Sequence, residues 1–121
     1  MKLKYIPVFA ENMETQINFY TQKLGFKQVG HISLVDDSPG AVIQAKNLDV
    51  ALVVTETDKA DYKSCIVLST DDCIKDYRLY KTLGVFFCVA PRYLPTGLTA
   101  EFLDPAGNRF ILFEERNYTE I

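Results

Sequence analysis

An internal repeat constrains the fold of this chain more than any other feature. ENMETQINFYTQKLGF, residues 11–26, can be laid over TDDCIKDYRLYKTLGV, residues 70–85. Both segments have the apolar spacing of a short amphipathic helix. A β-rich stretch precedes each segment and another follows it directly. The repeat therefore predicts two similar modules, each built around one helix.

Local signals mark the ends of both predicted helices. In the first, Asn12 is the candidate N-cap and Gly25 the left-handed stop. In the second, Asp71 or Asp72 serves the N-terminus and Gly84 ends the helix. The apolar stripe of the first helix comprises Met13, Ile17, Tyr20 and Leu24, and that of the second comprises Ile74, Tyr77 and Tyr80.

Eight β-rich stretches complete the two halves in the order βαβββ, repeated, which predicts an α+β fold. The predicted strands are residues 4–10, 26–35, 41–47 and 49–56 in the first half and 64–69, 85–90, 99–103 and 108–115 in the second. With 121 residues, the chain is expected to form a single domain, 1–121, made of modules 1–56 and 63–121. The polar stretch 57–63 is the predicted linker.

Two irregular stretches lie in the second half. Asp104, Pro105 and Gly107 fit a type I turn with glycine at a positive φ, which predicts a β-hairpin across EFLDPAGNRF. PRYLPTG, residues 91–97, is predicted as a loop, either a plain connection or a cover over a cavity.

Composition excludes several classes of function. The net charge is −3 and the basic residues are scattered, so a nucleic-acid partner is not expected. No apolar run is long enough to span a membrane and the start of the chain has no signal-peptide pattern, so a cytoplasmic protein is expected. The three cysteines, Cys65, Cys73 and Cys88, lack metal-site spacing and are expected to be small buried hydrophobes.

The repeated βαβββ order, the stretch AENMETQINFYTQKLGF and the ending AEFLDPAGNRFILFEE resemble the vicinal oxygen chelate superfamily. This superfamily includes glyoxalase I, extradiol dioxygenases, fosfomycin resistance enzymes and bleomycin resistance proteins. The resemblance covers nearly the whole chain. It implies that two mixed sheets curl into a cup with the helices packed outside, and that the functional site lies inside the cup.

The resemblance also implies where a divalent metal would be held, and this sequence departs from the pattern there. The ligand positions fall on Tyr5, on Cys65 (or Ser64 if the register slips by one) and on Ile111, with a fourth among the apolar residues of DVALVVTE. A catalytic metal needs three or four converging imidazole or carboxylate donors. No metal and no cofactor are therefore expected.

Other potential donors lie elsewhere in the sequence. The one histidine, His31, follows the first helix and is expected to be a solvated surface residue. Glu56, Glu101 and Glu114 lie near strand ends, where carboxylates are usually solvated.

Because side chains alternate across a strand, the cup face can be read from the sequence. Ile6, Val8, Ala10, Phe110 and Leu112 are expected to face the helices. The opposite parity gives the predicted ligand-binding residues: Tyr5, Phe9, Cys65, Val67, Arg109, Ile111 and Phe113, with Pro7 on the same side. Such a lining is apolar and aromatic with one cation, as in many ligand pockets. The alternative is that this face packs against itself or a partner.

Three functions follow. The first is metal-independent binding or sequestration of a small aromatic or amphipathic molecule, as in the bleomycin-resistance-like branch. The second is a metal-dependent lyase, dioxygenase or transferase with unusual ligands such as Cys65, Tyr5 or Glu101. The third is a sensor or structural dimer without a small ligand. The sequence favours binding over catalysis, and the resemblance implies a homodimer.

Overall fold

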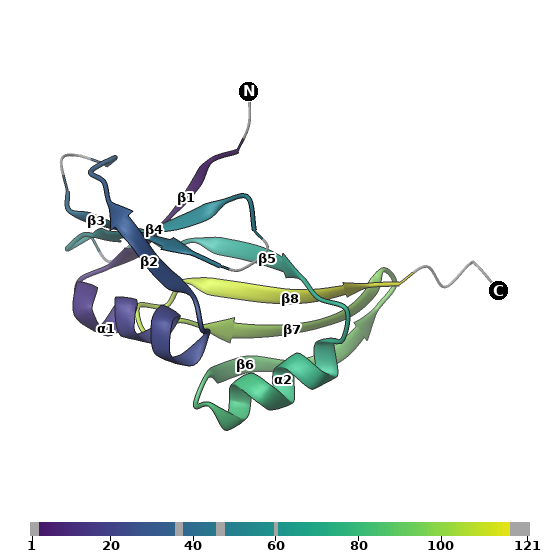
Figure 1. Ribbon diagram of the computed structural model, residues 1–121. Helices are drawn as coiled ribbons and strands as arrows, with labels where there is room; N and C mark the ends of the chain where they lie inside the picture. The colour runs from purple at the N-terminus through teal and green to yellow at the C-terminus, as the bar shows by residue number, and fades with distance from the viewer. Residues whose placement is uncertain (1–2, 36–37, 46–47, 60, 117–121) are drawn as a thin grey trace. The chain divides into compact units, whose positions relative to one another are not determined.

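The computed structural model describes residues 3–35, 38–45, 48–59 and 61–116. Its elements alternate as the repeat predicts (Figure 1): β1 (Tyr5–Ala10), α1 (Met13–Asn18), the π-helical turn η1 (Phe19–Lys23), β2 (Lys27–His31), β3 (Gly40–Gln44), β4 (Ala51–Glu56), β5 (Cys65–Ser69), α2 (Cys73–Thr82), β6 (Phe86–Leu94), β7 (Gly97–Leu103) and β8 (Arg109–Glu115). No helix in these ranges is long and apolar enough to cross a membrane.

The strands form two four-stranded mixed sheets with the same topology. One has the order β1-β4-β3-β2 and the other β5-β8-β7-β6. In each sheet the first and last strands of the module pair in parallel, and the remaining pairs are antiparallel. The predicted α+β fold of two βαβββ modules is thus confirmed.

The chain divides into two compact units. The first unit comprises Met1–Ser64 together with Pro105–Asn108, and the second comprises Cys65–Asp104 and Arg109–Ile121. Residues 57–59 and 61–63, predicted as part of a linker, belong to the first unit. So does the turn after Asp104, although the flanking strands β7 and β8 belong to the second.

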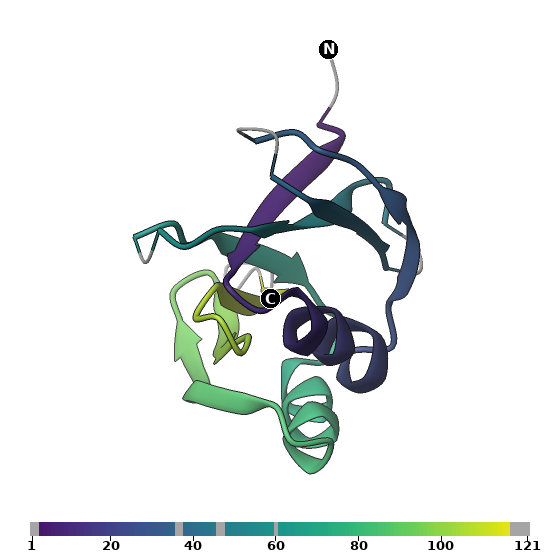
Figure 2. The same cartoon turned by 90° about the vertical axis from the view of Figure 1, so that its left-hand side faces the viewer.

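In the first unit, α1 packs against β4 (Figure 2). The side chain of Asn12 accepts a hydrogen bond from the amide of Thr15 at 3.0 Å, which confirms it as the N-cap, and Gly25 has a φ of 73°. The buried residues of this segment are Gln16, Phe19, Tyr20 and Leu24.

The predicted stripe of the first helix is only partly correct. Tyr20 and Leu24 are buried, whereas Met13 and Ile17 are partly exposed. The helix changes to π geometry at Phe19, and the amide of Leu24 bonds the carbonyl of Phe19, five residues back, at 3.3 Å. The wider π turn rotates the following side chains relative to a regular 3.6-residue pattern, and this moves the buried face.

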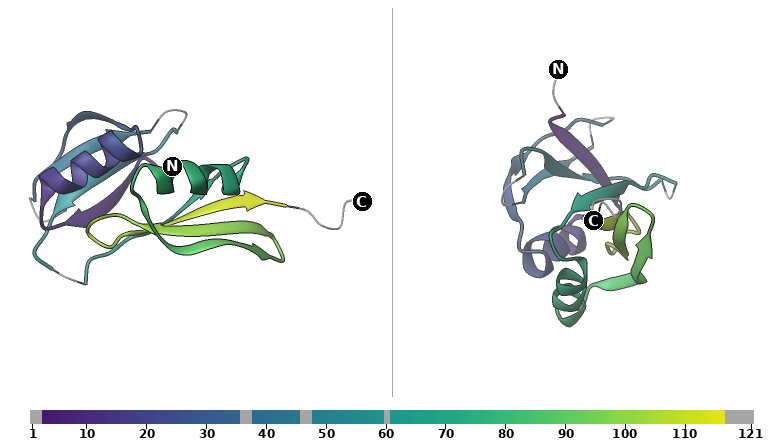
Figure 3. Two further views of the ribbon diagram at one scale, coloured as in Figure 1. Left: turned by 90° about the horizontal axis from the view of Figure 1, so that it is seen from below. Right: turned by 90° about the vertical axis from the view of Figure 1, so that its right-hand side faces the viewer.

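In the second unit, α2 lies along one face of its sheet (Figure 3). Asp72 is its N-cap, accepting from the amide of Lys75 at 3.0 Å, and Gly84 has a φ of 90°. Aromatic rings fill the space under the helix. The centroids of the Phe87 and Tyr77 rings are 4.8 Å apart. Phe102 stacks on Phe110 with 5.0 Å between the ring centroids.

The prediction of a loop at residues 91–97 is wrong. β6 continues to Leu94 and pairs with β7 from Gly97, so the segment is a tight β-hairpin. Gly97 has a φ of 148° and its missing Cβ would meet the carbonyl oxygen of Glu114 at 2.1 Å, so only glycine fits there. The hairpin predicted at EFLDPAGNRF is confirmed, with Gly107 at a φ of 91°.

Candidate functional site on the second sheet

The structure places the predicted ligand-binding residues in both compact units. Tyr5 and Phe9 lie on β1 in the first unit, whereas the other five lie on β5 and β8 in the second: Cys65, Val67, Arg109, Ile111 and Phe113.

In the first unit, the predicted face packs against itself. Tyr5 lies against a cluster formed by Val42, Ala51 and Val53, which are all buried. The Phe9 ring contacts the edge of the Tyr62 ring, with 5.3 Å between the centroids. Both aromatic side chains therefore already have protein partners.

In the second unit, the corresponding face lies on the side of the sheet opposite α2. The aromatic core under α2 includes Phe102 and Phe110, so the alternate residues of β7 and β8 point the other way. We call this side the Glu101 face. It is formed by Cys65, Val67, Arg109, Ile111, Phe113, Thr99, Glu101, Phe86, Val89 and Arg92, which the strand register brings together.

Large apolar side chains on the Glu101 face are left exposed to solvent. Val67 is 59% exposed and Phe86 is 66% exposed, while Ile111 and Phe113 are partly buried. Exposed apolar groups that share one face with charged groups are typical of a surface that meets a ligand or a partner. In contrast to Tyr5 and Phe9 of the first unit, Val67 and Phe86 keep more than half of their surface exposed.

A carboxylate between two guanidinium groups occupies the middle of this face. Oε2 of Glu101 lies 3.7 Å from Nη2 of Arg92, and Oε1 lies 3.6 Å from Nη1 of Arg109. The glutamate side chain is only 12% exposed, whereas those of the two arginines are 58% and 55% exposed. The prediction that Glu101 is a solvated strand-end charge is wrong, because β6 and β8 each bring an arginine to it.

Next to this ion-pair triad lies a hydroxyl with no partner. Thr99 precedes Glu101 by two residues on β7 and is opposite Arg92 in the strand register. The residue is 6% exposed, and within the described part of the chain its buried Oγ1 makes no hydrogen bond. Buried hydroxyls nearly always have a hydrogen-bond partner, so the Thr99 hydroxyl is an exception on this face.

Sequence reasoning did not select Arg92 or Thr99 for the site, and it named Glu101 only as an unusual metal ligand in the alternative function. The alternation of TAEFL already puts Thr99 and Glu101 on one face, and the hairpin at DPAG sets Glu101 opposite Ile111. That signal was available in the sequence. The position of Arg92 was not, because β6 carries two register shifts before reaching it.

The residues at the positions implied for a metal do not fit one. Ile111 has no donor atom. Ser64 donates its hydroxyl to the carbonyl of Pro7 at 2.6 Å and is a structural residue, while Cys65 is exposed next to Arg109 in the register. Across residues 3–35, 38–45, 48–59 and 61–116, no three His, Cys, Asp or Glu side chains are grouped so as to hold a metal ion.

The remaining candidate donors are surface or structural residues. His31 and Glu56 are exposed, as the sequence predicts. Glu114 is wrongly predicted as solvated: it is 5% exposed, and its Oε1 accepts the amide of Cys73 at 2.8 Å. Of the three cysteines only Cys73 is buried, so the prediction of buried thiols is wrong for Cys65 and Cys88.

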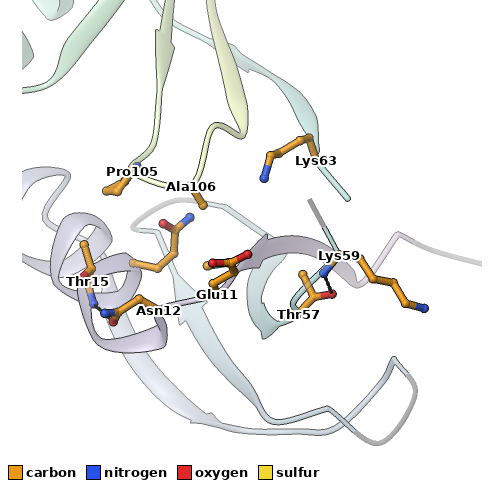
Figure 4. A pocket seen from close by; sticks show the side chains of 10 residues that line it. Glu11, Asn12, Thr15, Thr57, Lys59, Lys63, Pro105 and Ala106 are labelled. Atoms are coloured by element: carbon orange, nitrogen blue, oxygen red, sulfur yellow. Dashed lines mark hydrogen bonds between the residues drawn. The ribbon is translucent and has the colours of Figure 1, made fainter. Parts of the chain in front are cut away.

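A separate recess of about 340 Å³ lies in the first unit, beside α1 and the turn at Pro105 and Ala106 (Figure 4). Its lining is mostly polar, and several groups there are already used. Asn12 caps α1, and the hydroxyl of Thr57 accepts the amide of Lys59 at 3.1 Å. The side chain of Lys59 points away from Glu11. None of the seven predicted ligand-binding residues lines this recess.

The fold and the Glu101 face define a protein of two βαβββ modules with an amphipathic surface on the second sheet. A family model described as the Glyoxalase/Bleomycin resistance protein/Dioxygenase superfamily matches residues 2–112. The chain belongs to this superfamily, which confirms the resemblance drawn from the sequence. No curated protein matches the chain.

Solved structures share the fold over almost their whole length. UcmS2 has a TM-score of 0.83 at 22% identity, covering 95% of this chain and 98% of its own. TnmS3, an antibiotic binding protein from Streptomyces sp. CB03234, has a TM-score of 0.82 at 24% identity, covering 96% and 97%. A superfamily member from Sphaerobacter thermophilus DSM 20745 has a TM-score of 0.75 at 24% identity, covering 95% and 98%.

Proposed function

We propose that this protein binds a small aromatic or amphipathic molecule on the Glu101 face, without a bound metal. The observation that carries the proposal is the combination of exposed apolar side chains with a charged triad on one face. Val67 and Phe86 are more than half exposed on the same face of the sheet as two guanidinium groups. A flat ligand that covers part of this apolar surface gains about 25 cal/mol for each Å² removed from water.

The arginines suit an aromatic ligand as well as a charged one. Arg92 and Arg109 are planar cations that stack on aromatic faces and donate hydrogen bonds at their edges. Together with Phe113 they offer both stacking and polar recognition. The similarity in fold to TnmS3, an antibiotic binding protein, supports including antibiotic-like aromatic compounds among the candidate ligands.

Metal independence rests on the chemistry of the side chains at the implied ligand positions. A divalent ion loses its hydration shell only where several strong donors replace it, and Ile111 offers none. Elemental analysis of the purified protein is expected to find far less than one equivalent of zinc, nickel, manganese or iron per chain. One equivalent of metal per chain, with an activity that a chelator abolishes, would show that the protein is a metal-dependent enzyme instead.

A screen of aromatic compounds by thermal shift tests the binding itself, because a ligand that binds the folded state raises the melting temperature. For a ligand found in this way, Phe113→Ala is expected to weaken binding about tenfold, by loss of stacking and buried area. Tyr93→Ala is the matched control. Tyr93 is 73% exposed but pairs with Leu98, on the α2 side of the sheet, so its loss should leave affinity unchanged.

Two outcomes of this screen would contradict the proposal. Either no aromatic compound binds, or Tyr93→Ala and Phe113→Ala weaken binding equally. Tyr5 and Phe9 stay predicted ligand contacts and are tested by Tyr5→Ala and Phe9→Ala in the same assay. Their packing inside the first unit gives them weaker support than the residues of the Glu101 face.

We also propose that the protein is a homodimer, as symmetric dimers are the commonest soluble oligomers. Large apolar side chains on the α2 side of the second unit are exposed and offer a surface for a second copy: Ile74, Leu79, Leu83 and Tyr93. Sedimentation equilibrium is expected to give twice the mass of the 13.8 kDa chain. A monomer at all concentrations would contradict this.

A further inference from the structure

We infer that the ligand of the Glu101 face carries an anionic group, a carboxylate or an acidic phenol on its aromatic body. Arg92 and Arg109 hold this group, and the Thr99 hydroxyl completes its hydrogen bonding. The inference rests on the proposed function and adds the chemical class of the ligand.

The charges of the triad leave one positive charge unbalanced. Two guanidinium groups face one carboxylate, so the net charge of Arg92, Glu101 and Arg109 is +1. The two ion-pair distances, 3.6 and 3.7 Å, are longer than a hydrogen bond of 2.7–3.2 Å. The N–H donors of both arginines therefore remain available to an incoming oxygen anion, which guanidinium groups bind with two parallel hydrogen bonds.

Glu101 orients the two arginine side chains while leaving them exposed to a ligand. Its side chain is 12% exposed while theirs are more than half exposed, so the carboxylate lies deeper than the cations. Two long side chains attracted to one buried carboxylate lose much of their rotamer freedom before a ligand arrives. Glu101 is thus a positioning residue, and the ligand meets cations that are already oriented.

Thr99 gives an independent indication of a ligand on the same face. Its Oγ1 is buried and makes no hydrogen bond within the described part of the chain. A hydroxyl offers one donor and two acceptor lone pairs. A carboxylate bound at Arg92, the register partner of Thr99, would supply the missing acceptor. The apolar neighbours Ile111 and Phe113 lie opposite Glu101 and Thr99 on β8 and accommodate the aromatic body.

Two probes with the same ring separate charge from shape: 2-naphthoate, which is anionic, and 2-naphthamide, which is neutral. Titration calorimetry at pH 7.5 and low salt is expected to give at least about tenfold tighter binding for naphthoate. Arg92→Gln and Arg109→Gln should each remove about fivefold or more of the naphthoate affinity and leave the amide within about twofold. Arg78→Gln, on the exposed side of α2, is the matched control and should change neither.

Thr99→Val tests the unpartnered hydroxyl. Because it removes a buried polar group that has no partner, the unliganded protein should be as stable as before or more stable. Naphthoate affinity should nevertheless fall about threefold, as expected for one lost hydrogen bond. A variant that loses stability and leaves naphthoate affinity unchanged would show that the hydroxyl serves the fold, and would remove Thr99 from the site.

The outcomes distinguish this inference from the proposed function. If both probes bind equally and Phe113→Ala weakens both, the surface binds aromatic molecules but does not select anions. The inference is then overturned, and the proposed function stands. If the arginine variants lower the affinity for the amide as much as that for naphthoate, the arginines contribute to the structure of the face and do not recognise the charge. The inference is then also overturned. If neither probe binds, nor any compound of the aromatic screen, both are overturned.

Discussion

The side chain of Asn108 holds the backbone of Phe9 on both its amide and its carbonyl, 99 residues away in sequence. Nδ2 of Asn108 donates to the Phe9 carbonyl at 2.9 Å, and Oδ1 accepts from the Phe9 amide at 3.4 Å. The same Oδ1 accepts from the amide of Ser64 at 2.8 Å. Asn108 is fully buried, and its side chain ties the turn to β1 and to Ser64 within the first unit.

Replacing Asn108 by alanine is expected to lower the free energy of unfolding by about 2 kcal/mol, because it removes three hydrogen bonds to partly buried backbone groups of Phe9 and Ser64. Asn18→Ala, at an exposed position at the end of α1, is the control and should cost under about 0.5 kcal/mol. Urea denaturation measures both. Equal midpoints would mean that the Asn108 contacts contribute nothing to stability.

Gly107→Val is expected to destabilise the protein by at least about 1 kcal/mol, the strain of placing a branched residue at a positive φ. Its φ is 91°, and the added Cβ would meet Lys63 only at ordinary contact distance, so the cost is in the backbone. Gly30→Val tests the same change where the φ is not positive and the space is open. A thermal melt that shifts equally in both variants contradicts this assignment of the strain.

Tyr20→Ala should cost about 3–5 kcal/mol, whereas Ile17→Ala should cost less than about 2 kcal/mol. Tyr20 is fully buried, while Ile17 keeps part of its surface in water because the π turn shifts the buried face. The exposed Gln22→Ala should cost under about 0.5 kcal/mol. A larger loss of unfolding free energy for Ile17→Ala than for Tyr20→Ala in chemical denaturation would contradict this shift of the buried face.

Stability is expected to fall at alkaline pH partly through the Cys73 thiol. Burial raises the pKa of this thiol above its ordinary value of 9.0, and the nearby carboxylates, Glu114 first, raise it further. Well below pH 9.0 the thiol is protonated in both the folded and unfolded states. As the pH rises above 9.0, the unfolded chain releases this proton first, so the free energy of unfolding decreases.

The measurement is the free energy of unfolding at several pH values from 8 to 10, for the wild type and Cys73→Ala. The wild type should lose stability more steeply with pH than the variant. Burial also raises the pKa of Tyr80, with Asp76 adding to it, and this part of the slope should persist in both proteins. Parallel curves would mean that Cys73 does not contribute.

How far the candidate site followed from the sequence differs from residue to residue. The alternation of β8 correctly put Phe110 and Leu112 on the buried side facing the helix and Arg109 on the opposite face, because it depends only on the period of a strand. Glu101 was expected to be solvated, since a carboxylate is usually exposed unless it has partners. Its partners come from β6 and β8 and are invisible in its own segment.

The sequence by itself determined the repeated βαβββ order, the helix cap at Asn12 and the hairpin turn at Gly107, and it narrowed the second cap to Asp71 or Asp72. These features depend on backbone dihedrals and on hydrogen bonds within about four residues, so local sequence suffices. Only the tertiary structure decided that Asn108 bonds Phe9, that β6 runs on to Arg92, and that Glu101 lies between two arginines. Each of those depends on strand register and on segments distant in sequence, and the burial of a charge is decided by the partners that other strands bring to it.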